Sequence, residues 1–446
     1  MIERRMQVWP LAWPILIEQF LRIMFMNVDV IMIGYYSSKA VAAVGPVTTM
    51  TFFVMILYAI VGNGAGIVIS QHLGADKPRE AGDTALAAMN MMLLLGVVLS
   101  VILSLSTDVI MNMFGFTDTV KGFAKEYWVI FALTSLTQAS NIAFSAILRS
   151  YGYAKLPMLI NMGANVFNVF GNYVFIFGAF GMPVLGVTGV ALSTSIARGI
   201  GAVVMIIFIF NMKDIWLPFK DIARIPKSIY SSILKIGGPT AAEMLSYNTA
   251  QLFMIRIVAS FGTAPLAAMT YTQNIGRFIF VCSQSLGAAG QILAGYLVGG
   301  GRYDEAQRRV RRVFYIAFIV SVSIATVVAI FRYPLISLLT KDPEVISLIA
   351  LLLLIQIPLE AGRSFNLVFI NAMKGAGDVK YPVVIGVLSM WGIGVCFALI
   401  FGHVLGWGLA GVWWGITCDE SFRGIFSAAR WNTGRWYKKK LMKGAL

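Results

Sequence analysis

Long apolar runs separated by short polar segments recur along the whole chain. The runs MMLLLGVVLSVILSLS and LIALLLLIQIPL, for example, contain no charged residue. A helix needs about 20 apolar residues to cross the roughly 30 Å hydrocarbon core of a bilayer. The pattern therefore predicts an all-α integral membrane protein with twelve transmembrane helices, over residues 9–35, 42–71, 86–112, 125–149, 156–179, 187–212, 230–259, 265–296, 311–338, 343–373, 381–403 and 407–429.

Composition agrees with this class of protein. Hydrophobic residues make up 58% of the 446 residues and charged residues 12%, and the mean hydropathy is +0.79. Soluble globular proteins have about 25% charged residues. The first apolar run follows MIERRM and continues to full spanning length, so it predicts a membrane helix rather than a cleaved signal peptide.

Basic residues are distributed unevenly between the two sides of the predicted spans. The chain has 35 Lys and Arg against 20 Asp and Glu, a net charge of +15. Most basic residues lie in the N-terminal segment, in the loops after every second span and in the C-terminal segment. The positive-inside rule then predicts a multi-pass protein of the cytoplasmic membrane with both termini in the cytoplasm. We interpret the excess of basic residues mainly as a signal of membrane topology, with some attraction to anionic lipid headgroups. We expect no nucleic-acid partner.

The chain is a repeat of one unit at a spacing of 225 residues. Pro14 matches Pro239 and Glu18 matches Glu243, and glycine, asparagine and lysine positions match at the same spacing. Each copy holds six spans, so both copies have the same orientation in the membrane. This predicts two parallel six-helix bundles related by a pseudo-two-fold axis along the membrane normal. The predicted parts are an N-terminal bundle, a cytoplasmic linker, a C-terminal bundle and a basic cytoplasmic tail, over residues 1–212, 213–229, 230–429 and 430–446.

Two segments outside the spans carry aromatic and basic residues. In the linker, Trp216, Phe219, Ile222 and Ile225 recur every three residues among charges. This is typical of an amphipathic connector in the membrane interface, although a plain linker fits equally. The tail RWNTGRWYKKKLMKGAL fits an interfacial anchor or a solvated end.

Three charged residues share one face of the first predicted helix. Glu18, Arg22 and Asp29 differ by only about 40° or less around a helix. Glu18 and Arg22 are one turn apart and can pair, whereas Asp29 has no charged neighbour within a turn. A charge in the bilayer normally faces the bundle interior or a water-filled cavity. A carboxyl without a charged partner in a low dielectric can exchange a proton near neutral pH.

A row of amides follows in the fifth predicted helix. Asn161, Asn165, Asn168 and Asn172 are spaced by four, three and four residues and lie within about 60°. Four amides on one face would be costly in lipid, so they indicate a polar surface, although single asparagines also join helices. Thr194 adds a hydroxyl in the sixth helix.

The second half is not a chemical copy of the first. Met254 stands where the repeat would place a second Asp29, while Glu243 keeps the position of Glu18. Acidic and basic residues three or four positions apart look self-neutralising, which favours a structural role; they are Glu360 with Arg363, and Asp419 and Glu420 with Arg423.

Motifs for other chemistry are missing from the sequence. Cys282, Cys396 and Cys418 are isolated and no CxxC occurs, so the sequence predicts neither a disulfide framework nor a metal site. No Gly-rich phosphate loop, nucleophile elbow or zinc spacing appears. We therefore expect no enzymatic activity and no cofactor.

These features together resemble the multidrug and toxic compound extrusion (MATE) family. Each half opens with P-x-x-x-E, in PILIEQ and PTAAEM, and VDVIMIGYYSSKAVAAVGP resembles the family's junction between spans 1 and 2. GYAKLP and GAGDVKYP follow the fourth span of each half. The resemblance covers essentially the whole chain through the order and spacing of these motifs.

The resemblance implies export of amphipathic, often cationic or aromatic small molecules, including xenobiotics, in exchange for H+ or Na+. It implies a cation site at Asp29, Asn168 and Thr194. Asn172 stands where relatives carry a second acid, and this single-carboxylate site favours H+ over Na+. We assign Asn172 to the same site and expect a monomer. We expect the substrate cavity to be lined by Glu18, Arg22, Asn161, Asn165, Glu243, Glu360 and Arg363.

Two other transporter classes remain as alternatives. A lipid-linked precursor flippase of the same superfamily would need a basic cavity, for which Arg22, Arg256, Arg277 and Arg363 are candidates. A major-facilitator transporter is also a parallel repeat of six spans. Its loop between spans 2 and 3 usually carries a basic motif around GxxxD, which QHLGADKPREAGD fits poorly.

Overall fold

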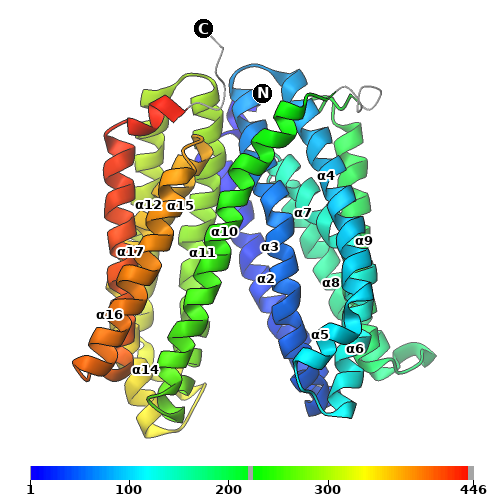
Figure 1. The fold of residues 1–446 in the computed structure, drawn as a ribbon, viewed down its shortest axis with the longest axis vertical. Coiled ribbons are helices and arrows are strands. Elements are labelled where there is room, and N and C mark those ends of the chain that lie inside the picture. The colour runs from blue at the N-terminus through cyan, green and yellow to red at the C-terminus, as the bar shows by residue number, and fades with distance from the viewer. Residues whose placement is uncertain (1, 219–224, 440–446) are drawn as a thin grey trace. The chain divides into compact units, whose positions relative to one another are not determined.

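The computed structural model describes residues 2–218 and 225–439 (Figure 1). This part of the chain is made of helices joined by short loops and contains no strand. The predicted all-α class is confirmed. The helices of the first half are α1 (Ile2–Arg5), α2 (Val8–Tyr36), α3 (Ser38–Gly74), α4 (Pro78–Leu105), α5 (Thr107–Met113), α6 (Asp118–Leu133), α7 (Ser135–Ser150), α8 (Lys155–Phe177), the 3-10 turn η1 (Ala179–Gly181) and α9 (Gly186–Asn211).

The second half repeats this order of long helices. Its first two long helices are α10 and α11, and its last long helix is α17 (Figure 1). The elements are α10 (Lys227–Ala259), α11 (Thr263–Gly299), α12 (Tyr303–Ile330), α13 (Arg332–Ser337), α14 (Pro343–Gly375), α15 (Lys380–Ser389), η3 (Met390–Val395), α16 (Cys396–Leu399), η4 (Ile400–Val404), α17 (Gly408–Asn432) and η5 (Arg435–Lys439).

Each of the twelve predicted spans coincides with a helix or a run of helices. Seven helices are individually long and apolar enough to cross a membrane, and the bent pair α6 and α7 makes an eighth. The other four are α2, α8, α10 and α17, which have between 23 and 33 residues. These four carry most of the charged and amide residues singled out above, which lowers their hydropathy.

Some predicted spans are not straight helices. The predicted span 125–149 bends by 52° between α6 and α7. At the bend, the Thr134 hydroxyl donates to the carbonyl of Ile130 at 2.7 Å and lies 2.7 Å from Ser195 Oγ. A hydroxyl that bonds back to the preceding turn commonly bends a helix. The predicted span 86–112 likewise divides at Ser106 into α4 and α5, and the predicted span 381–403 contains the π-helical turns η3 and η4.

The chain forms two compact units. Unit 1 contains residues 1–5, 17–73 and 77–238, and unit 2 contains residues 6–16, 74–76 and 239–446. The start of α2 thus groups with unit 2, and the start of α10 groups with unit 1. The units otherwise follow the two sequence repeats.

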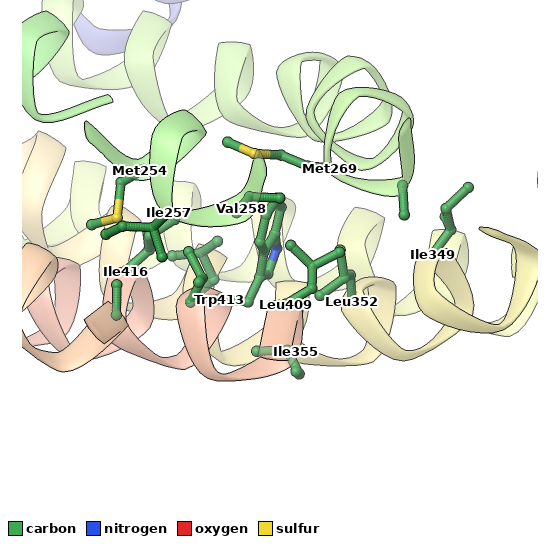
Figure 2. Close-up of a cluster of buried hydrophobic side chains, with 14 of the residues drawn as sticks. Met254, Ile257, Val258, Met269, Ile349, Leu352, Ile355, Leu409, Trp413 and Ile416 are labelled. Carbon is green, nitrogen blue, oxygen red and sulfur yellow. The ribbon is translucent and has the colours of Figure 1, made fainter. Parts of the chain in front are cut away.

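A large apolar core holds unit 2 together. Figure 2 shows Met254 and Ile257 of α10 beside Trp413 and Ile416 of α17, with side chains of α11 and α14 completing the cluster. Trp413 is 3% exposed, and its Nε1 donates to Gln356 Oε1 at 3.2 Å. The indole therefore packs as an apolar residue while its one donor is satisfied.

In unit 1, close helix contacts place the polar residues of α8 and α9 beside each other. At Gly171 of α8, an added Cβ would come 2.3 Å from the hydroxyl of Ser193 in α9. That hydroxyl donates to the backbone carbonyl of Asn168 at 2.8 Å. Only glycine leaves room for this contact, so the asparagine face of α8 meets α9 directly.

The linker and tail are only partly within the described residues. Residues 212–218 form a turn and irregular chain rather than a helix, and Phe219 and Ile222 lie outside the described residues. In the tail, Trp436 is 1% exposed and stacks on Trp431 with ring centroids 4.1 Å apart. Neither alternative given for the tail, an interfacial anchor or a solvated end, places these two rings in the protein interior, where the structure has them. Residues 440–446 lie outside the described range.

Candidate cation-coupling site

Asp29 lies two turns before the end of α2 and faces α8. Its Oδ1 accepts a hydrogen bond of 2.6 Å from Asn172 Nδ2, and the side chain of Asn172 is fully buried. No ion pair within 4 Å forms at Asp29 among the described residues. The carboxyl group is therefore held by an uncharged donor.

The amide of Asn168 reaches the same carboxyl group. In one orientation of this amide, Nδ2 lies 3.1 Å from Asp29 Oδ1, and the amide oxygen accepts from the hydroxyl and the N–H of Thr194 at 3.0 and 3.1 Å. An amide's oxygen and nitrogen are assigned from such networks, and this orientation satisfies all three groups. The structure thus brings together the four residues predicted for ion coupling.

Arg198 is a charged neighbour that the sequence pattern missed. It lies in α9, one turn after Thr194, and is close enough to Asp29 to act on it electrostatically. Tyr127 of α6 lies near Arg198 in the same way. Spacing along one helix could not pair residues of α2 and α9, which are far apart in the sequence.

Glu18 pairs with Arg149 and not with the predicted partner Arg22. Arg149 Nη2 of α7 donates to Glu18 Oε1 at 2.6 Å, and Asn161 Nδ2 of α8 donates to the same oxygen at 2.7 Å. Arg22 is exposed and makes no hydrogen bond or ion pair with the described residues. The spacing of four residues allows the Glu18–Arg22 pair, but the closer guanidinium comes from another helix.

The remaining amides of α8 differ in their partners. Asn161 Oδ1 also accepts from Asn141 Nδ2 of α7 at 3.3 Å. Asn165 is half-buried and makes no hydrogen bond with the described residues. Of the four amides, Asn165 is therefore the one that the rest of unit 1 leaves free.

The second half repeats the Glu18–Arg149 pair at a spacing of 225 residues. Lys374 Nζ of α14 lies 2.6 Å from Glu243 Oε2 of α10, and both side chains are at least 88% buried, with 9% and 12% exposed. Glu243 corresponds to Glu18 and Lys374 to Arg149. The repeated spacing is a sequence signal that could have found both pairs.

A cluster of five charged residues lies in the membrane helices of unit 2. Arg363 Nη1 donates to Glu360 Oε1 at 2.7 Å, and Gln356 Nε2 donates to the same oxygen at 2.7 Å. Arg423 lies 2.5 Å from Asp419 and 3.4 Å from Glu420. The predicted self-neutralising pairs are confirmed.

Asn366 of α14 also contacts this charged cluster. Its Nδ2 donates to Glu420 Oε2 at 2.6 Å. A small hollow beside the cluster is lined by Met254, at the position that corresponds to Asp29, and by Tyr247, Ala250, Gln251, Met390, Ile416, Asp419 and Glu420. Residues 2–218 and 225–439 contain no group of three His, Cys, Asp or Glu that could hold a metal ion.

Comparison with known proteins assigns the family. A family model described as MatE matches residues 14–174 and again residues 239–400, and the two matches begin at Pro14 and Pro239. The chain belongs to the MATE family of transporters. It is a multi-pass membrane protein of two six-helix units, and the MATE resemblance read from its motifs is confirmed.

Individual relatives match over nearly the whole chain. An uncharacterized transporter of Bacillus subtilis, YisQ, is 37% identical over 98% of this chain and 96% of its own length. A protein of Thermotoga maritima named probable multidrug resistance protein NorM is 27% identical over 99% of this chain and 95% of its own.

Solved structures share the fold. A structure described as the outward-facing conformation of a multidrug resistance MATE family transporter aligns with a TM-score of 0.90 at 20% identity, over 97% of this chain and 96% of that one. A transporter of the same superfamily from Pyrococcus furiosus, described as having a binding pocket of reverse polarity, aligns with a TM-score of 0.89 at 20% identity. It covers 97% of this chain and 96% of its own.

Proposed function

We propose that this MATE protein is a secondary antiporter that exports amphipathic, cationic or aromatic small molecules, with H+ as its coupling ion and Asp29 as its coupling group. The observation that carries the proposal is the Asp29 carboxyl group, which two amides hold and no described residue pairs with. Its donors lie on α8 and its electrostatic neighbour on α9. A change of charge at this group therefore acts on three helices at once.

Asparagine suits a partner that gains and loses a proton. An amide can donate to a carboxylate through its nitrogen or accept from a carboxylic acid through its oxygen. Asn172 Nδ2 donates to Asp29, while its Oδ1 is buried with no partner among the described residues. Rotation of this amide would let it accept from a protonated Asp29, so both charge states have a hydrogen bond.

The same geometry favours H+ over Na+. A sodium ion needs several hard oxygen ligands with compensating negative charge, whereas a proton needs one oxygen. The site offers one carboxylate, and in the orientation described above the Asn168 oxygen and the Thr194 hydroxyl are bonded to each other. The Asn168 oxygen also accepts from the N–H of Thr194, so Na+ would have to compete with two donors for that oxygen.

The transport cycle follows from this chemistry. The outward-facing protein holds substrate while Asp29 is ionised. Protonation removes the charge to which the α8 amides donate, so α2 and α8 repack and substrate leaves. The protonated form returns to the inward-facing state and releases the proton. Arg22 and Asn165, which the described residues leave free, are the candidates for substrate contact. Glu243, Glu360 and Arg363, also expected at the cavity, are already engaged by other side chains.

Efflux from proteoliposomes under separately imposed pH and sodium gradients tests the proposal. A fluorescent cationic dye serves as substrate. The pH gradient should drive efflux by the unaltered protein, and Asp29→Asn should slow it by at least about tenfold, within the range of typical coupling free energies. The control is Met254→Leu, at the corresponding position of unit 2, which should stay within about twofold. Normal proton-driven efflux by Asp29→Asn would falsify the proposal.

Proteoliposomes of the same preparation also test the flippase alternative. A flippase would have to bind a pyrophosphate headgroup with free basic side chains. Arg363 is engaged by Glu360 and Glu420, which leaves Arg22, Arg256 and Arg277 as the candidates. We expect no acceleration of lipid-linked pyrophosphate movement between leaflets. Rapid movement without dye efflux would instead support the flippase.

A further inference from the structure

Two side-chain contacts join α2 to α8 at matching intervals. Asn161 donates to Glu18 at 2.7 Å, and Asn172 donates to Asp29 at 2.6 Å. The two acids are 11 residues apart in α2, and the two amides are 11 residues apart in α8. Eleven residues make just over three full turns and a rise of about 16 Å. Both contacts therefore lie on one face of each helix, and the helices run in the same direction.

The two contacts differ in how the charge of the acid is balanced. Glu18 Oε1 receives both the Arg149 guanidinium and the Asn161 amide, so its charge is neutralised by an ion pair. Asp29 receives amides only. An Arg partner cannot lose its charge. The Glu18 contact is thus fixed in charge, whereas the Asp29 contact can change.

The second half keeps the ion pair but lacks the rest of this arrangement. Gly386 stands at the position of Asn161, and an added Cβ there would lie 3.3 Å from Glu243 Oε1. Met254 and Phe397 stand at the positions of Asp29 and Asn172. The amide beside the ion pair is therefore present in the first half, which has Asp29 to position. It is missing from the second half, which has Met254 in place of Asp29.

We propose that Glu18, Arg149 and Asn161 form a register clamp, which fixes α8 along α2 so that Asn168 and Asn172 reach Asp29. These three are positioning residues, and the inference rests on the proposed function of Asp29. A relative slide of half a turn, about 2.7 Å, would stretch the Asn172 contact beyond hydrogen-bonding distance. The clamp prevents that slide while Asp29 is charged and gives α2 and α8 a fixed point about which to repack when Asp29 is not.

The test measures how the rate of dye efflux from proteoliposomes depends on the concentration of the coupling ion and on the concentration of dye. The two values obtained are the half-maximal concentration of the coupling ion and the half-saturating concentration of dye. The variants are Asn161→Ala, which leaves the Glu18–Arg149 pair intact, and Arg149→Gln, which removes it. Lys374→Gln is the matched control because it removes the corresponding ion pair of unit 2. Arg149→Lys keeps the charge and should restore normal behaviour.

We expect Asn161→Ala and Arg149→Gln to change the half-maximal ion concentration by at least about threefold, as expected for residues that tune coupling. The half-saturating dye concentration should stay within about twofold, and Lys374→Gln should leave the ion dependence unchanged. A purely structural role would lower the amount of active protein without moving the ion dependence. An unchanged ion dependence in both first-half variants overturns the clamp.

Asp29→Asn in the same assay separates this outcome from failure of the proposed function. If Asp29→Asn is inactive while Asn161→Ala shows the normal ion dependence, only the clamp is wrong. If Asp29→Asn is fully coupled, the proposed function itself is wrong. Because Asn161→Ala removes no charge and leaves the ion pair in place, misfolding of Arg149→Gln would still leave a decisive measurement.

Discussion

The first and second halves of this transporter use one helical framework for two different arrangements of charge. In the first half, the first long helix carries Asp29, and the sixth carries Arg198. In the second half, the first helix has Met254 instead, and the sixth carries Asp419 and Glu420. At the spacing of 222 residues that matches Gly186 and Gly189 with Gly408 and Gly411 near the end of each half, Arg198 corresponds to Glu420, so the charge at this position is reversed.

The difference indicates which charges serve structure and which can serve transport. The three acids of the charged cluster in unit 2, Glu360, Asp419 and Glu420, lie within hydrogen-bonding or ion-pair distance of Arg363 or Arg423, and Glu360 is fully buried. Removing one partner of such a buried ion pair is strongly destabilising, because it leaves the other charge buried without compensation. Asp29 has no such partner among the described residues, so its charge can change without leaving an opposite charge unpaired in direct contact.

Removal of Arg423 should show this contrast most strongly. Arg423→Gln would leave Asp419 and Glu420 buried, at 5% and 4% exposure, without their shared guanidinium. Breaking a buried pair from one side costs about 3–5 kcal/mol. We expect a sharp loss of thermal stability in detergent, measured by the unfolding temperature of the purified protein.

Two variants serve as controls for Arg423→Gln. Asp419→Asn removes one of three carboxylates and leaves two against two guanidiniums, so it should cost only about 1 kcal/mol. Asp29→Asn should also unfold within a few degrees of the unaltered protein, although we expect it to slow transport. If Asp29→Asn were as unstable as Arg423→Gln, the division between structural and coupling charges would be wrong.

The spans were predictable because the bilayer imposes a local requirement. Each helix must carry about 20 apolar residues to cross the hydrocarbon, and this can be counted without knowing any neighbour. The bend at Thr134 was not predictable in this way. Its hydroxyl also meets Ser195, 61 residues away in sequence, and a contact of that kind depends on how the helices pack.

The candidate site was predictable in part for the same reason. Helical periodicity placed the four amides of α8 on one face, and the contacts of Asn168 and Asn172 with Asp29 agree with it. The partner of Glu18 was missed because Arg149 is 131 residues away. Local spacing suggested Arg22 instead, although the 225-residue repeat holds the information that Glu18–Arg149 and Glu243–Lys374 are equivalent pairs.

Replacing corresponding glycines by alanine should destabilise the two halves by different amounts, and this difference should be smaller than the effect of removing Arg423. At Gly287 an added methyl would meet the Leu367 carbonyl oxygen and Asn371 Nδ2, both at 2.9 Å, whereas at the corresponding Gly62 it would meet the Ile142 Cγ2 at 3.0 Å. A backbone carbonyl cannot move aside as a side-chain methyl can. We expect Gly287→Ala to lower the free energy of unfolding by about 2–3 kcal/mol and Gly62→Ala by about 1 kcal/mol.

Chemical unfolding of the two alanine variants in parallel, in one detergent, gives this difference directly. Gly45→Ala is the control, because an added methyl there would meet no atom within 4 Å. Equal losses at Gly62 and Gly287 would show that the two units pack these helices with the same tolerance, and would remove this distinction between the halves.

The smallest expected effect concerns two arginine–aspartate pairs outside the membrane core. In the first half, Arg5 and Tyr153 both donate to Asp214 Oδ2 at 2.8 Å, and the Asp214 side chain is 36% exposed. In the second half, Arg430 donates to the buried Asp378 at 2.6 Å. The Arg5 hydrogen bond, helped by Tyr153, holds the pKa of Asp214 below its usual value.

A lowered pKa in the folded state fixes the sign of the pH dependence. The Asp214 contact stabilises the folded protein above the unfolded carboxyl pKa of about 3.9 and is lost as the pH falls through the lower folded value. Since the group is largely exposed, Asp214→Asn should cost under about 1 kcal/mol at pH 7. The difference in unfolding temperature between Asp214→Asn and the unaltered protein should stay constant from pH 8 to about 5 and shrink below about 4. A difference that grew on acidification would mean that the carboxyl group is stabilised in its protonated form, and that Arg5 is not its main partner.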